Sequence, residues 1–320
     1  MLDAIICDNC YNQHGTAHDC VFCQKVASAG TGQKIVYIPL DGIVVAFNDF
    51  CTAKSEAGLR YTKRMISIDH CMQGRAQWEH DDGSFCYLGE DDIQVSVNTD
   101  HTCCFGLPAC KYRGITVNIF IDQAEAALKV CFPTFDINLQ QRWKKFSVKK
   151  DFFVTMAQTQ IHNVFLSLYQ SKENITNNFL LLKVMELIIA LDSMDKDEFS
   201  GEKPYFKRSH VEKVRQVKEY LCENADKRST IDDLVDRFDI PKSTLKMCFK
   251  VMYGMPISEF MMHYRLHHAA KLLRTTDMSI TEISLMSGYE NPSKFSAAFK
   301  RSFAETPLRY RKDNHHMECF

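Results

Sequence analysis

Two short stretches near the end of the chain decide its fold: PKSTLKMCFK at residues 241–250 and PSKFSAAFK at residues 292–300. Each begins at a proline, carries two large apolar residues four positions apart and ends in lysine. Leu245 and Phe249 in the first stretch correspond to Phe295 and Phe299 in the second, with a shift of fifty positions. A spacing of four places both side chains on one face of a helix. The pattern therefore predicts the same helix twice.

A helix start precedes each stretch. Thr230 is followed three residues later by Asp233, and Ser279 by Glu282. A hydroxyl and an acid at this spacing can satisfy the free amides of a first helical turn. Helix, turn and second helix, present twice, are typical of a helix-turn-helix unit, whose second helix enters the major groove of DNA. Double-stranded DNA is the predicted partner.

The segment between the two units, residues 256–274, predicts one long helix with two apolar stripes. The first stripe is Ile257, Phe260, Met261 and Tyr264, and the second is Leu266, Ala269, Ala270 and Leu273. Nine positions separate the stripes, which at about 100° per residue places them on opposite sides. The helix would be roughly 28 Å long, close to the ~34 Å between successive major-groove faces. We call the second helix of each unit, which contains residues 241–250 or 292–300, its reading helix. One chain could therefore place two reading helices in adjacent turns of DNA.

Because Leu245 and Phe249 face inward, other side chains of the predicted reading helices face outward. In the first unit the candidate DNA contacts are Ser243, Lys246, Met247 and Lys250. In the second unit they are Asn291, Pro292, Ser293, Lys294 and Ala297, with Lys300 and Arg301 suited to phosphates. The alternative for all of them is a solvated helix face, which we rank second because the unit recurs.

The two predicted helix-turn-helix units lie in the more basic part of the chain. Residues 1–200 hold 18 Lys+Arg and 24 Asp+Glu, a net −6, and residues 201–320 hold the other 21 and 16, a net +5. A basic half suits a phosphate backbone. No apolar run reaches the ~18 residues of a membrane span, and no signal peptide begins the chain, so a cytoplasmic protein is expected.

The first two thirds of the chain predict a β region followed by helices. Short apolar runs at 43–47, 66–68, 85–88, 93–97 and 115–121 indicate strands, with Asp82-Gly83 at a hairpin turn. From Phe152 the apolar residues recur at helical spacing, and residues 179–191 are almost continuously apolar. Such a helix is buried in its own domain or shared with a second copy, and we favour a homodimer. The fold class is α+β.

Fourteen cysteines in a cytoplasmic chain are expected to be reduced, and Cys71, Cys86, Cys131 and Cys248 are predicted core residues. The pairs Cys7/Cys10 and Cys20/Cys23 have the gap that lets two thiolates share one zinc ion. The alternatives are a zinc or redox site and an irregular tail with free thiols.

His70, Glu79, His80 and His101 fit no ligand spacing, so core or solvated roles are favoured for them. We find neither a Gly-rich phosphate loop nor a nucleophile elbow and predict no enzyme.

The stretch SITEISLMSGYENPSKFSAAFKRSFAETPLRYR, Ser279 to Arg311, resembles the signature of the AraC/XylS family of bacterial transcription regulators. Its Gly288-Tyr289 turn, Phe303, Thr306-Pro307 and Tyr310-Arg311 are in register, and the likeness extends back to about Val211. The family's base-contact positions fall on Ser243, Lys246, Met247, Pro292, Ser293, Lys294 and Ala297. Two residues depart from the family pattern, Ala304 in place of a glycine and Met247 in place of a polar base reader.

Composition predicts an irregular Cys-rich segment at 1–33 and, from the charges around Gly201 and Pro204, an exposed linker at 195–209. The resemblance implies a double helix-turn-helix domain at 210–313 and a cupin-like β-sandwich sensor with dimerisation helices at 34–194. It implies a regulator that binds promoter DNA, contacts RNA polymerase and responds to a small-molecule effector. A metal- or thiol-responsive sensor using Cys7, Cys10, Cys20 and Cys23 is the alternative.

Overall fold

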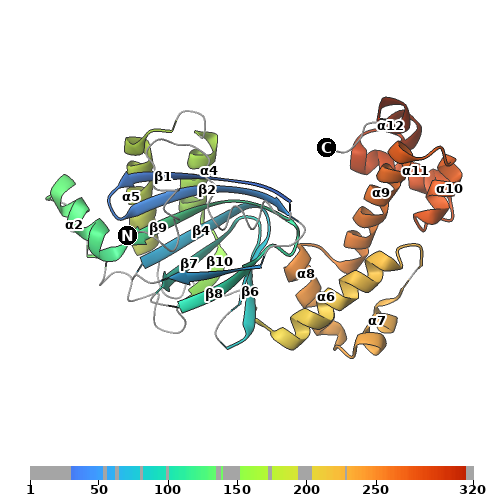
Figure 1. The fold of residues 1–320 in the computed structure, drawn as a ribbon, viewed down its shortest axis with the longest axis horizontal. Coiled ribbons are helices and arrows are strands. Elements are labelled where there is room, and N and C mark those ends of the chain that lie inside the picture. Colours follow the sequence, from blue (N-terminus) through green and yellow to red (C-terminus); the bar gives the residue numbers. More distant parts are fainter. Residues whose placement is uncertain are drawn as a thin grey trace. The chain divides into compact units, whose positions relative to one another are not determined.

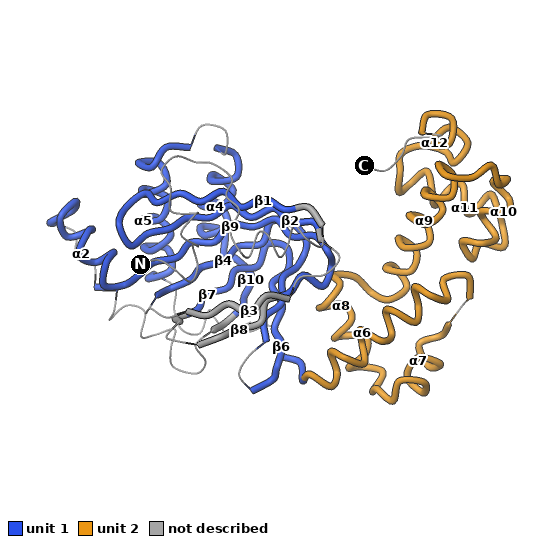
Figure 2. Tube along the Cα trace, viewed as in Figure 1, with its two compact units in different colours: residues 1–207 blue, residues 208–320 orange. Residues whose placement is uncertain are grey.

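The computed structural model describes residues 30–52, 56–61, 65–79, 82–98, 101–134, 138–139, 152–171, 175–193, 204–227 and 229–314. The chain forms two compact units, Met1–Lys207 and Arg208–Phe320 (Figure 2). The first contains the β-sheets and the second is helical (Figure 1), which confirms the α+β class. No helix of the described residues combines the length and apolar character that crossing a bilayer demands.

Two antiparallel sheets build the first unit. The larger sheet has the order β1-β2-β9-β4-β7-β10, formed by Gly30–Leu40, Ile43–Thr52, Lys111–Phe120, Met65–Gly74, Asp92–Asn98 and Phe152–Met156. The smaller sheet has the order β11-β6-β5-β8-β3, formed by Phe206–Lys207, Ser84–Leu88, Ala76–Glu79, His101–Gly106 and Glu56–Tyr61. The predicted Asp82-Gly83 hairpin is confirmed, since β5 and β6 pair on either side of it.

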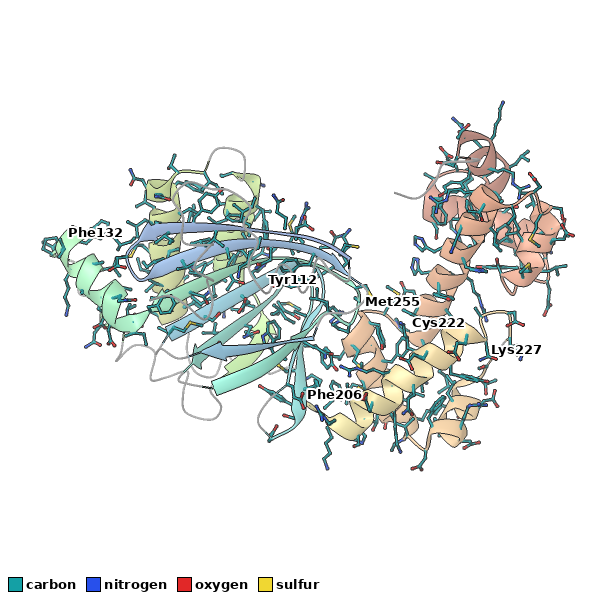
Figure 3. The ribbon with its side chains drawn as sticks, in the orientation of Figure 1. Tyr112, Phe132, Phe206, Cys222, Lys227 and Met255 are labelled. Atoms are coloured by element: carbon teal, nitrogen blue, oxygen red, sulfur yellow. The ribbon has the colours of Figure 1, made fainter. Side chains whose placement is uncertain are left out.

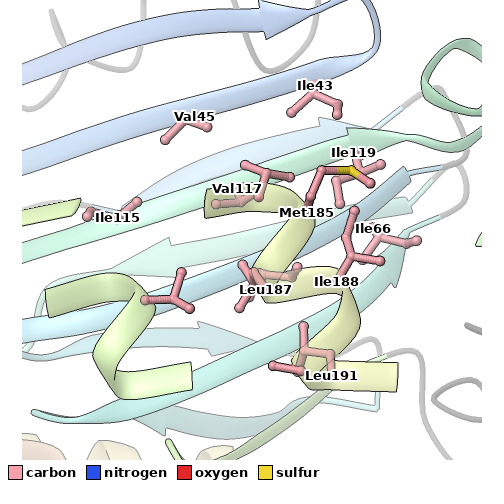
Figure 4. Packing of buried hydrophobic residues seen from close by; sticks show 14 of the residues in the cluster. Ile43, Val45, Ile66, Ile115, Val117, Ile119, Met185, Leu187, Ile188 and Leu191 are labelled. Atoms are coloured by element: carbon pink, nitrogen blue, oxygen red, sulfur yellow. The ribbon is translucent and has the colours of Figure 1, made fainter. Parts of the chain in front are cut away.

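Helices cover one face of the larger sheet. They are α4 (Thr159–Gln170) and α5 (Asn177–Ser193), while α2 (Ile121–Cys131) follows β9 and adds Ile121, Ala124 and Leu128 to the same buried cluster. Alternate strand residues such as Val45, Ile66 and Val117 pack with Leu187 and Ile188 of α5 in one buried cluster (Figure 4). The period-2 alternation of the strands and the apolar character of residues 179–191 therefore meet in one core.

A second buried cluster joins the two sheets on the other face. Phe50, Cys71 and Tyr112 belong to the larger sheet and pack with Trp78 and Cys86 of the smaller one. Tyr112 is almost fully buried there (Figure 3). The unit thus has two layers of strands and an outer layer of helices.

Three expectations for the first unit were wrong. Phe152–Met156 is not helical but is strand β10, because it pairs with β7 at the sheet edge and this tertiary pairing outweighs a spacing that also suits a helix. Ile121 is the first residue of α2 rather than the end of a strand. Cys131 is exposed at the end of α2, whereas Cys71, Cys86 and Cys248 are buried as predicted.

The helical unit consists of α6 (Arg208–Glu223), α7 (Ile231–Phe238), α8 (Lys242–Tyr253), α9 (Ile257–Thr275), α10 (Ile280–Met286), α11 (Pro292–Phe303) and α12 (Pro307–Asn314). Of the predicted linker, residues 195–203 lie outside the described residues, and residues 206–209 belong to β11 and the start of α6.

Candidate nucleic-acid interface

The first helix-turn-helix unit begins with the predicted cap at Thr230. Its hydroxyl accepts a hydrogen bond from the Asp233 amide at 3.1 Å, and the Asp233 carboxylate accepts one from the Thr230 amide at 2.8 Å. These hydrogen bonds lower the pKa of Asp233. After α7 the chain turns at Asp239, which has a left-handed φ of 46°, and α8 follows. The reciprocal cap fixes where α7 starts and hence where α8 can lie.

The second helix-turn-helix unit has the same construction. Ser279 accepts from the Glu282 amide at 3.1 Å, and Glu282 accepts from the Ser279 amide at 2.7 Å, which lowers the pKa of Glu282. Gly288 makes the turn with φ 74°. Asn291 then caps α11 by accepting a hydrogen bond from the Ser293 amide at 2.8 Å, and Pro292 occupies its first turn. Both predicted caps are confirmed.

Helices α8 and α11 are equivalent along their whole length. Each has twelve residues, and the paired apolar residues Leu245/Phe249 and Phe295/Phe299 are fully buried. Each ends on a left-handed residue, Gly254 with φ 84° and Ala304 with φ 60°. The shift of fifty positions is therefore structural, and it gives the two helices corresponding outer faces.

The residues predicted to contact DNA lie on these outer faces. Pro292 is half-buried; the exposed ones are Ser243, Lys246, Met247, Lys250, Asn291, Ser293, Lys294, Ala297, Lys300 and Arg301. Met247 is 49% exposed, which is high for a large apolar side chain. The shift of fifty pairs Ser243 with Ser293, Met247 with Ala297, and Lys250 with Lys300. Each outer face thus runs from a small polar residue through an apolar one to a cation.

Helix α9 joins the two units with a different side to each. In its first half, Phe260 packs edge-on against Phe249 of α8, with ring centroids 5.4 Å apart. In its second half, Leu266, Ala269, Ala270 and Leu273 enter a buried cluster with Ile283, Phe295 and Phe299. The predicted change of buried side along this helix is confirmed. The two reading helices are therefore held on one rod of nineteen residues.

Arg265 of α9 binds the loop before α7 and lies close to the turn of the second helix-turn-helix unit, which the sequence patterns did not indicate. Its guanidinium donates to the carbonyl oxygens of Ala225 and Lys227 at 2.7 and 2.8 Å, in the loop after α6, where Figure 3 labels Lys227. A Cβ at Gly288 in the second turn would lie 3.3 Å from the same guanidinium. An arginine in a helix predicts a solvated or phosphate-binding role, so only the fold reveals this structural one.

The residues weighed as metal ligands from the sequence are only partly covered by the described residues. Cys7, Cys10, Cys20 and Cys23 lie outside the described residues, as does His80. Glu79 and His101 belong to β5 and β8 of the smaller sheet, whereas His70 belongs to β4 of the larger one. His70 is buried and stacks on Phe165, and its ring lies close to Asp91 and His162. Burial lowers the pKa of His70 to about 4, so its ring is neutral at pH 7.

Comparisons with known proteins agree with this geometry. A family model described as a helix-turn-helix domain matches residues 234–313. The xylose operon regulatory protein of Escherichia coli (strain K12) is 35% identical over 101 residues, which cover 32% of this chain and 26% of that protein. The probable transcription factor PqrA of Proteus vulgaris is 35% identical over 83 residues, or 26% of this chain and 68% of PqrA.

A solved structure of the xylose-binding transcription activator xylR is 33% identical and covers 33% of this chain and 28% of that one, with a TM-score of 0.31. The chain thus spans about a quarter of the length of the E. coli regulator and about two thirds of PqrA.

Proposed function

The chain belongs to the AraC/XylS family of bacterial transcription regulators, and on this premise we propose that it binds promoter DNA with both helix-turn-helix units and regulates transcription in response to a small polar effector. The observation that carries the proposal is the equivalence of α8 and α11, two helices with matching outer faces on one connecting helix. In a helical unit without a duplicated helix-turn-helix, we would not expect the buried apolar pair and the left-handed helix end to recur fifty positions later, each after a capped helix.

In this proposal the two reading helices divide the work between bases and phosphates. Ser243, Lys246 and Met247 of α8, and Pro292, Ser293, Lys294 and Ala297 of α11, face the major groove. Asn291 caps the start of α11, and Lys250, Lys300 and Arg301 lie in the last turns of the two helices, where cations suit phosphates. Serine, alanine and proline make few bidentate contacts, so α11 would read groove shape more than base identity.

The test is the salt dependence of DNA binding. Genomic fragments captured by the full-length protein supply the operator, and binding is then measured across a salt series. Lys300→Ala and Arg301→Ala should each weaken binding to operator and random DNA alike. Each should flatten the slope of log K against log salt by about 0.9, the value for one phosphate contact. Lys129→Ala in the other unit is the charge-matched control, expected to change neither quantity. Unchanged slopes in both variants would refute the phosphate role.

The effector would bind on the face of the larger sheet that is turned toward the smaller sheet, because this face carries buried polar side chains. Cross-strand partners form one row of Asn118, Ser67 and Ser96 and another of Asp69, Gln94 and the half-buried Thr116. Buried polar atoms are normally hydrogen-bonded. Within the described part of the chain, the side-chain oxygens of Asn118 and Gln94 have no partner. Such atoms suit a ligand with hydroxyl or amide groups, inside what we propose is a cupin-like sensor domain.

Effector binding can be tested on the full chain with a panel of neutral polar molecules. Pentoses belong in the panel because one relative is a xylose operon regulator. We expect one class to raise the melting temperature and to change operator affinity, and Asn118→Leu to abolish both responses. A panel response that Asn118→Leu leaves unchanged would exclude this face as the binding site.

The remaining parts of the proposal concern assembly. Residues 34–194 would form the sensor, 195–209 the linker and 210–313 the DNA-binding domain, with RNA polymerase as a partner at the promoter. A homodimer would form through α5, where Leu182 and Ile189 are 64% and 49% exposed and lie seven positions apart on one side. Two apolar side chains exposed in this way favour burial against a second copy.

A metal- or thiol-responsive input through Cys7, Cys10, Cys20 and Cys23 is the alternative to the polar effector. Changing all four cysteines to serine separates the two. An unchanged promoter response in that variant excludes the cysteine input, and a lost response excludes a sensor that works through the β unit alone.

A further inference from the structure

Three side chains that can bind a metal meet on the helix-covered face of the larger sheet. His70 comes from β4, Asp91 from the turn before β7, and His162 from α4. One ligand atom from each residue lies within 4.8 Å of the other two. Nδ1 of His162 is 3.7 Å from an Asp91 carboxylate oxygen. These residues span more than ninety positions in sequence, and the sheet register and α4 bring them together.

The imidazole of His70 is held in an orientation that leaves one nitrogen free. The Tyr169 hydroxyl lies 3.4 Å from the His70 carbonyl oxygen and 3.3 Å from His70 Nδ1. When the hydroxyl donates to the carbonyl, Nδ1–H donates to the hydroxyl oxygen, and the lone pair is then on Nε2. Nε2 is buried, and nothing in the described residues hydrogen-bonds to it.

We propose that His70, Asp91 and His162 form a binding site for a divalent transition metal of the zinc class. Two imidazole nitrogens and one carboxylate oxygen are ligands that zinc accepts, and three protein ligands leave a fourth position for water or a small molecule. Tyr169 would be the positioning residue, since a ligating histidine commonly uses its other nitrogen to hold its orientation.

The three ligands differ in how far they can move. His70 is fixed by its stacking on Phe165, with ring centroids 4.5 Å apart. The side chains of His162 and Asp91 are 36% and 65% exposed, so both can rotate toward a metal held by His70. The ligand atoms are farther apart than in a filled site, where metal–ligand bonds of about 2.0–2.2 Å bring them closer. The two mobile side chains would close that difference.

A plain structural role explains less of this arrangement. Stacking on Phe165 accounts for the burial of His70, and an ion pair accounts for His162 beside Asp91. Neither explains a buried Nε2 without a partner beside two further ligands, because interiors normally satisfy such atoms. A metal bound there would use the orphaned nitrogen and would fix α4 to the sheet.

The experiment is metal binding by the full-length chain in which Cys7, Cys10, Cys20 and Cys23 are serine, so that thiolates of the first segment cannot contribute. Zinc is titrated calorimetrically and Co²⁺ by absorption. We expect one ion per chain, with Co²⁺ d–d bands and no thiolate charge-transfer band. His162→Gln and Asp91→Asn should each weaken the affinity by more than roughly 100-fold, since even second-sphere changes cost about 10–100-fold.

Two further variants make the result specific. Tyr169→Phe should weaken the affinity by about 10–100-fold through its effect on His70. His263→Gln is the control, because His263 is a partly exposed histidine of α9, 4.0 Å from Glu259, and this change should have no effect. An absence of binding, or an affinity that His162→Gln or Asp91→Asn leaves unchanged, overturns the site. Because DNA binding is not the readout, the result is independent of the proposed function.

Discussion

The ends of the two reading helices offer a direct test of how backbone conformation contributes to stability. Ala304 ends α11 with φ 60° and ψ −1°, and Gly254 ends α8 with φ 84° and ψ −10°. A left-handed conformation costs an alanine roughly 1–2 kcal/mol, and glycine adopts it freely. Glycine loses about 0.5–1 kcal/mol more backbone entropy on folding. Ala304→Gly should therefore raise the free energy of unfolding by about 0.5–1 kcal/mol.

The reciprocal change, Gly254→Ala, should lower the free energy of unfolding of the same unit by a similar amount. Both residues are exposed, so neither change alters the packing of the core. Urea unfolding of the helical unit is followed by far-UV circular dichroism. With a slope of about 1–3 kcal/mol per molar urea, the midpoint should rise by about 0.5 M in one variant and fall by a similar amount in the other.

Tryptophan fluorescence serves as the internal control for both variants. Both tryptophans, Trp78 and Trp143, precede the helical unit in the sequence, so the midpoint from fluorescence should stay constant. The reasoning is refuted if Ala304→Gly lowers the midpoint or leaves it unchanged, or if the two variants move it in the same direction.

Three other changes test the core, the titration and the assembly of the chain. Leu273→Ala should lower the free energy of unfolding by about 2–5 kcal/mol, because this fully buried residue of α9 packs against α11. Unaltered operator binding and stability in this variant would contradict that packing. Burial raises the pKa of Asp69 to about 6, so the folded chain binds the extra proton between about pH 4 and 6 and stability falls as pH rises through this window. Across this window the free energy of unfolding should fall by about 3 kcal/mol, at 1.36 kcal/mol per pKa unit. Asp69→Asn should remove this dependence on pH. If urea midpoints of the variant still fall as pH rises, another group titrates. Leu182→Lys should convert the proposed dimer to a monomer in light scattering, whereas Leu308→Lys, an equally exposed leucine on α12, should not.

The helical unit could be predicted because its signals are local. Caps three residues apart, apolar pairs four apart and the reversed stripe of α9 are properties of single helices, and all were found where the sequence patterns indicated. The Ala304 departure was recognised for the same reason, since a left-handed helix end depends on adjacent residues. The role of Arg265 was missed because its partners, Ala225 and Lys227, are about forty positions away.

The β unit was harder to predict because strand pairing decides it. β1, β3, β8 and β10 were not predicted, and β10 has a spacing that also fits a helix until β7 lies beside it. The neighbours of His70 show the same dependence. Asp91 reaches His70 because β4 and β7 are in the register that opposes His70 to Ile93. A shift of one residue would send these side chains to opposite faces.

The alternation along β4 also makes the two ligand proposals for this unit separable by experiment. Asp69 and His70 are adjacent, yet Asp69 faces the polar side with Thr116, and His70 faces α4 and Phe165. A change confined to one face should leave the other unaffected. Asp69→Asn should thus keep the zinc affinity, and His162→Gln should keep the pH slope of stability. If either variant altered both readouts, the ligand sites would be coupled through the backbone of β4, and single substitutions could no longer assign them to one face.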